Sequence, residues 1–174
     1  MKTIRNLAGL ITLIGPLLLN GPALADPGTR REAAAKHEQD TASSITAQMA
    51  EKMLGAAERA AREKNLSIVV SIVDRHGNLK YFHRMDNTSV GSIQVSQLKA
   101  STSAQFPLST KVLAERSAGL PGNPYASIPG FLLLEGGLPI INKNGLHLGG
   151  IGISGATPEL DAQFAQAAID QLDQ

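Results

Sequence analysis

Apolar residues recur every three or four positions in two long segments, which predicts two amphipathic helices. The first follows Ser44 and ends near Asn65, a residue that tolerates the backbone conformation found after a helix. The last begins at Thr157-Pro158, because Thr caps a helix N-terminus and Pro suits the first helical position. The apolar positions of the two helices are Ile45, Met49, Met53, Leu54, Ala56, Ala57, Ala60, Leu160, Phe164, Ala167, Ala168 and Leu172.

Short apolar segments with turn residues between them predict five strands. The first two, Leu66–Asp74 and Leu79–Met85, are separated by a four-residue turn. A short strand at Phe131–Leu134 leads into a hairpin formed by Leu138–Ile141 and Leu146–Ser154. The turn of this hairpin contains Asn-Gly, a pair that tolerates the positive φ of tight hairpin turns.

Two further helices are expected between the strand pairs, at Ser89–Phe106 and Ser109–Ser117, with Pro107 ending the first. The three prolines and three glycines of residues 119–130 predict an irregular loop. The element order is therefore α-β-β-α-α-β-β-β-α. Adjacent strands joined by short turns pair antiparallel. The expected fold is α+β, with a five-stranded, mostly antiparallel sheet packed with about four helices in a single domain of residues 44–174.

The first 25 residues are expected to be a signal peptide. Lys2 and Arg5 precede a short apolar stretch, and Ala23-Leu24-Ala25 fits the small-residue cleavage pattern. Cleavage starts the mature chain at Asp26 without a membrane span, in the periplasm or, as the alternative, secreted. Residues 26–43 are polar and lack an apolar stripe, so they are expected to form a mobile polar arm or a solvated helix outside the core.

Composition excludes several classes of function. The chain has no Cys, so it has no disulfide, thiolate nucleophile, zinc finger or covalent C-x-x-C-H haem attachment. Removal of Lys2 and Arg5 from the 16 basic residues leaves 14 against 15 acidic residues. This near-neutral balance gives no electrostatic reason to expect a nucleic-acid partner.

Gly149, Gly150 and Gly152 lie inside the last predicted strand. Glycine weakens a strand interior, so such a cluster indicates close approach of a helix, another subunit or a ligand. The segment also fits G-x-G-x-x-G, but only 19 residues follow Gly155. A dinucleotide fold needs a further strand there, so close packing of a helix on the sheet is the favoured interpretation.

His83 shares one face of its predicted strand with Tyr81 and Met85, which brings three possible haem-iron donors together. The alternative is that His83 is an ordinary core or interface histidine. His147 is the second candidate for an iron ligand. His37 and His76 are expected to be exposed to solvent.

Three segments carry a family resemblance: VVSIVDRHGNLKYFHRMD, SIQVSQLKASTSAQF and EGGLPIINKNGLHLGGIGISGATPELD. They resemble the GlcG/HbpS family of haem-binding proteins, which is also similar to the C-terminal domain of PduO-type proteins. The matched positions are Asp74, Gly77, Asn78, Leu79, Arg84, Met85, Asp86, Lys99, Ala100, Gly136, Gly137, Pro139, Ile140, Gly149, Ile151, Gly152, Ser154 and Gly155. Asn87 departs from the Gly that usually follows Arg-Met-Asp in the family.

The resemblance implies a homo-oligomer of α+β subunits, with non-covalent haem in some members, partly near subunit contacts. It favours an exported haem-binding protein for haem storage or sensing, with a membrane sensor or transporter as an open partner class. His83, Tyr81, Met85 and the strand glycines are then the candidate binding residues. One alternative is a lyase-type enzyme that uses Lys99, Asp161 or His83 at a glycine-rich subunit contact. Another is a protein whose only role is oligomeric docking.

Overall fold

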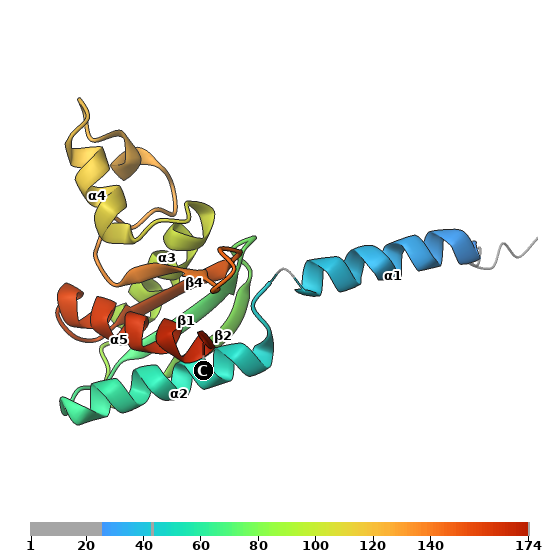
Figure 1. Cartoon of the computed structure of the whole chain (residues 1–174). Helices are drawn as coiled ribbons and strands as arrows, with labels where there is room; N and C mark the ends of the chain where they lie inside the picture. The colour runs from blue at the N-terminus through green and yellow to red at the C-terminus, as the bar shows by residue number, and fades with distance from the viewer. Residues whose placement is uncertain (1–25, 43, 174) are drawn as a thin grey trace, which may run out of the picture.

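The computed structural model describes residues 26–42 and 44–173 (Figure 1). The predicted signal peptide lies outside this part of the chain. The elements, in order, are α1 (Pro27–Ala42), α2 (Ala47–Glu63), β1 (Val69–Asp74), β2 (Leu79–Arg84), α3 (Gly91–Gln105), α4 (Thr110–Ala118), the 3-10 helix η1 (Pro124–Ser127), β3 (Gly137–Ile141), β4 (His147–Ser154), α5 (Pro158–Asp170) and the 3-10 helix η2 (Gln171–Asp173).

The polar segment before the domain forms α1, which projects away from the remaining elements (Figure 1). Its side chains at residues 28–35 are exposed, as the lack of an apolar stripe predicts. This corresponds to the solvated-helix alternative, and mobility of the arm stays a prediction. No helix in the described part of the chain is both long and apolar enough to cross a membrane.

The sheet has four strands in the order β2-β1-β4-β3, and every neighbouring pair is antiparallel. The α+β class is confirmed, but the predicted fifth strand at Phe131–Leu134 is wrong. Its backbone is bound by helix side chains instead of a neighbouring strand. The Leu132 amide donates to Thr102 Oγ1 at 2.9 Å, and Thr110 Oγ1 donates to the Leu134 carbonyl at 2.7 Å. This segment therefore connects α3 and α4 to the sheet as an irregular chain.

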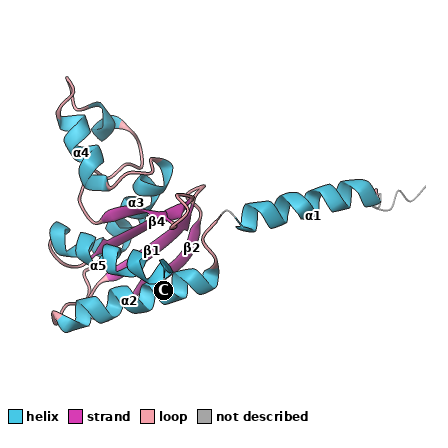
Figure 2. Cartoon of the chain, viewed as in Figure 1, coloured by secondary structure: helices cyan, strands magenta, loops and turns pink. Residues whose placement is uncertain are grey.

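Helices cover both faces of the sheet (Figure 2). On one face, α2 and α5 pack against each other and form the main core with the strands. Met53 of α2, Ile72 of β1, Ile151 of β4 and Phe164 of α5 are fully buried there. On the other face, α3 lies across β1, β4 and β3. The result is a three-layer arrangement in which the sheet separates α3 from α2 and α5.

Two glycines of β4, Gly150 and Gly152, let α3 lie very close to the sheet. A Cβ atom at Gly152 would collide with the backbone of Ser96 and Ala100, and one at Gly150 would collide with the Ala100 carbonyl. Ser71 of β1 and Ser96 of α3 add a hydrogen bond of 2.8 Å between their hydroxyls. The prediction of close helix packing is confirmed here. An open glycine surface for a porphyrin is wrong at Gly150 and Gly152, because α3 of the same chain covers both.

This packing generates a stability prediction for Gly152→Ala. The added methyl group must push α3 away from β4, and overpacking of this kind costs about 1–3 kcal/mol or more. The matched control is Gly91→Ala at the start of α3, where a Cβ would meet nothing within 4 Å. Urea unfolding should show a clearly lower midpoint for Gly152→Ala and little change for Gly91→Ala. Equal midpoints for the two variants would contradict the close packing.

Candidate functional site

Strand β2 places His83 beside α2. His83 pairs with Val70 of β1 and Tyr81 pairs with Ile72, and both β1 residues belong to the core on the α2 side. His83 Nε2 lies 2.8 Å from Glu58 Oε1 of α2, and the His83 side chain is 43% exposed. The ring thus lies against a carboxylate on one side, while part of it stays open to solvent.

The other predicted donors on this face are less available than His83. Met85 is only 6% exposed, and its Sδ accepts a hydrogen bond of 3.4 Å from the Ile68 amide. Met85 is therefore a core residue, which corrects its prediction as an iron donor. Tyr81 is half-buried and packs against the main core.

The remaining histidines are held differently. Nε2 of His147 lies 2.8 Å from the Gly149 carbonyl of its own strand. His76 lies in the β1–β2 turn, where its Nε2 accepts from Arg75 Nε at 3.2 Å. The His37 side chain lies outside the described part of the structure. No group of three or more His, Cys, Asp or Glu residues within the described ranges is arranged to hold a free metal ion. His83 thus combines a half-exposed ring with a neighbouring carboxylate.

The two candidate catalytic residues, Lys99 and Asp161, form a buried ion pair. Lys99 Nζ donates to Asp161 Oδ2 at 2.8 Å and to the Ile153 carbonyl at 2.9 Å. Asp161 Oδ1 accepts a hydrogen bond of 3.0 Å from the amide of Ala156, which precedes α5. Gly136 makes room for the pair, since a Cβ there would lie 2.6 Å from Lys99 Nζ.

Burial dominates the chemistry of this pair. Lys99 is 1% exposed and Asp161 is 2% exposed. Burial raises the pKa of Asp161, and the hydrogen bond and charge of Lys99 oppose that rise. The sequence identified both residues, and the structure brings them together across 62 positions. Neither side chain reaches the surface, and the pair joins α3 to α5.

Glu58 is the residue at the His83 site that the sequence analysis did not select. Glu58 lies on α2, and in the sequence it cannot be told apart from the other charged residues expected on the surface of this helix, such as Arg62. Arg62 indeed lies 3.6 Å from Glu58, as expected for a pair four residues apart. Only the packing of α2 against β2 shows that the Glu58 carboxylate meets a histidine.

A family model described as "Haem degrading protein HbpS-like" matches residues 45–170. The chain belongs to the HbpS-like family. A relative, an uncharacterized 15.0 kDa protein of Citrobacter freundii, is 36% identical over 72% of this chain and 90% of its own length. A double mutant of HbpS from Streptomyces reticuli has a similar structure, with a TM-score of 0.70, 30% identity, and coverage of 94% of this chain and 100% of that chain.

A further solved structure is similar to this HbpS-like chain. PduOC in complex with haem has a TM-score of 0.66 and 28% identity, and the match covers 75% of this chain and 99% of that chain. The family resemblance seen in the sequence is therefore confirmed, including its PduO branch.

The buried pair generates a prediction about stability. Removal of one partner leaves an uncompensated buried charge, so Lys99→Met or Asp161→Asn should each lower the free energy of unfolding by about 3–5 kcal/mol. The double variant should lose less than the sum of the two, because neither buried charge remains. Urea unfolding of the four proteins measures this coupling. Strictly additive losses would show that the two residues do not stabilise the fold as a pair.

Proposed function

We propose that the chain is an exported protein that binds haem non-covalently, with His83 as an axial ligand of the iron. The observation that carries this proposal is the half-exposed His83 ring beside the Glu58 carboxylate, in a chain whose fold resembles that of PduOC in its haem complex. Storage or sensing of haem is the proposed role. Export is supported by the sequence of residues 1–25, which favours the periplasm over full secretion.

The donor groups on the His83 face suit a haem iron. Imidazole and phenolate are both used as haem ligands, and His83 and Tyr81 supply these groups on one strand face. A carboxylate commonly binds the second nitrogen of a ligating histidine and fixes its orientation. Glu58 offers such a carboxylate, since its buried Oε1 lies 2.8 Å from His83 Nε2 and makes no hydrogen bond to any other described group. Bound haem would supply iron redox and ligand-binding chemistry, while His83 and Glu58 hold its position.

Self-association is the second part of the proposal. Large apolar side chains are exposed around α4 and η1, and they include Phe106, Leu120 and Ile128, which are 42%, 45% and 36% exposed. Exposed apolar surface of this kind favours a protein partner, and we propose a second copy of the chain. A membrane sensor or transporter is a proposed downstream partner. The buried positions of Lys99 and Asp161 favour binding over the lyase-type alternative.

The proposal predicts a saturable Soret shift when haemin is added to the mature chain. His83→Ala should weaken binding by about tenfold or more and change the Soret maximum, because the axial ligand is lost. Glu58→Gln should retain binding with about tenfold lower affinity, because the ring loses its charged orienting partner. The measurement is an absorbance titration of each variant.

His76→Ala is the matched control, since His76 lies in the exposed β1–β2 turn, and its titration should equal that of the wild type. A wild-type titration without saturation would refute haem binding. A His83→Ala protein with unchanged affinity and spectrum would refute the assignment of the ligand.

A further inference from the structure

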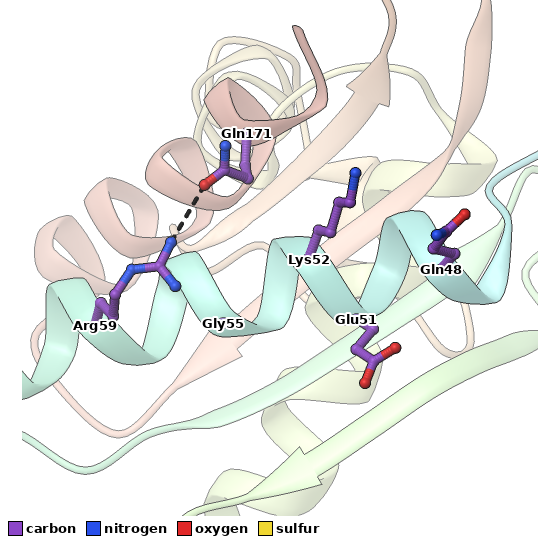
Figure 3. A pocket seen from close by; sticks show the side chains of 6 residues that line it. All are labelled: Gln48, Glu51, Lys52, Gly55, Arg59 and Gln171. Atoms are coloured by element: carbon purple, nitrogen blue, oxygen red, sulfur yellow. Dashed lines mark hydrogen bonds between the residues drawn. The ribbon is translucent and has the colours of Figure 1, made fainter. Parts of the chain in front are cut away.

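The outward face of α2 contains a polar hollow beside the C-terminal η2. Its volume is about 570 Å³. The residues that line it are Gln48, Glu51, Lys52, Gly55, Arg59 and Gln171 (Figure 3). Lys52 and Arg59 point toward the α5 side of the helix, whereas Glu51 points to the opposite side (Figure 3). Two cations and an amide therefore converge on one side of the hollow, which favours an anionic ligand.

Gly55 forms the floor of the hollow in the middle of α2. Glycine in a helix interior costs about 1 kcal/mol relative to alanine. The neighbouring elements do not require it, since a Cβ at Gly55 would approach only Arg59 Nη1, at 3.3 Å. Gly152 differs, because there a Cβ would strike the backbone of α3. The bare backbone at Gly55 thus gives space to the Arg59 guanidinium and to whatever binds above it.

Arg59 is positioned in advance for a carboxylate. Its Nη2 donates to Gln171 Oε1 at 3.2 Å, which orients the guanidinium over the hollow (Figure 3). A guanidinium carries five N–H donors in a planar fork that matches carboxylate oxygens. Lys52, two helical turns before Arg59, adds a second and more mobile positive charge. The arrangement suits a ligand with two carboxylate groups.

Glu58, whose carboxylate lies beside His83, directly precedes Arg59 and lies three residues from Gly55. Consecutive residues of a helix point about 100° apart, so the hollow and the His83 site lie on neighbouring sides of α2. A helix with its side chains is only about 10–12 Å wide, so one large ligand can contact both places. Haem carries two propionate carboxylates at one edge of the porphyrin. We propose that Arg59 and Lys52 bind the haem propionates, an inference that rests on the proposed haem-binding function.

The test compares haemin with its dimethyl ester, in which both propionates are neutral. Wild-type protein should bind haemin about tenfold more tightly than the ester at low ionic strength, because charge-assisted hydrogen bonds are lost in the ester. The double variant Lys52→Gln/Arg59→Gln should lose this preference, with lower affinity for haemin and unchanged affinity for the ester. Its Soret maximum with haemin should match the wild type, since the iron ligand is intact.

The charge-matched control is Lys64→Gln/Arg116→Gln, which removes one Lys and one Arg that are exposed and outside the hollow. It should keep the wild-type preference for haemin. Equal wild-type affinity for haemin and ester, or a preference that survives in Lys52→Gln/Arg59→Gln, would overturn the propionate site and leave haem binding in place. Failure of the wild type to bind either porphyrin would overturn the proposed function and this inference together.

Discussion

The contact between α3 and the glycine-bearing strand β4 determines the arrangement of the whole domain. Because Gly150 and Gly152 have no side chains, the backbone of α3 lies directly on the sheet. Because α3 lies so close to the sheet, the Lys99 side chain extends past Gly136 and reaches Asp161. Asp161 is in the first turn of α5, which lies on the other side of the sheet. One buried ion pair therefore joins the two helical layers. Burial of a charge is unfavourable without a partner, so each layer needs the other to keep its charged residue stable.

This constraint also acts on the proposed haem site, through α5 and α2. The position of α2 depends on its packing against α5, and α2 carries both Glu58 and Arg59. Its inner face is built from small and apolar residues that fill the core, while its outer face holds the carboxylate beside His83 and the cations of the hollow. The proposed ligand residues thus lie on rigid elements, a helix and a strand, whose relative position is fixed by the core.

Local sequence patterns predicted most of the elements but not their neighbours. The caps of α5 and the Asn-Gly hairpin depend on residues close in sequence, and the structure has a helix and two paired strands there. The strand predicted at residues 131–134 failed because Thr102 and Thr110, distant in sequence, bind its backbone. The glycines of β4 indicated close approach, yet only the fold shows that α3 is the neighbour. Likewise, the place of His83 on its strand was predictable from the sequence, whereas its contact with Glu58 depends on the packing of α2 on β2.

The most direct test of this account is an NMR measurement of the lysine ammonium groups in ¹⁵N-labelled protein. Lys99 Nζ is enclosed and donates to both Asp161 and the Ile153 carbonyl, so its protons should exchange slowly with water. Exposed lysines such as Lys52 should exchange too fast to be seen under the same conditions. The account predicts a protected ammonium signal that disappears in Lys99→Met and shifts in Asp161→Asn. A Lys99 ammonium group that exchanges as fast as the exposed lysines in the folded protein would contradict the buried connection between the layers.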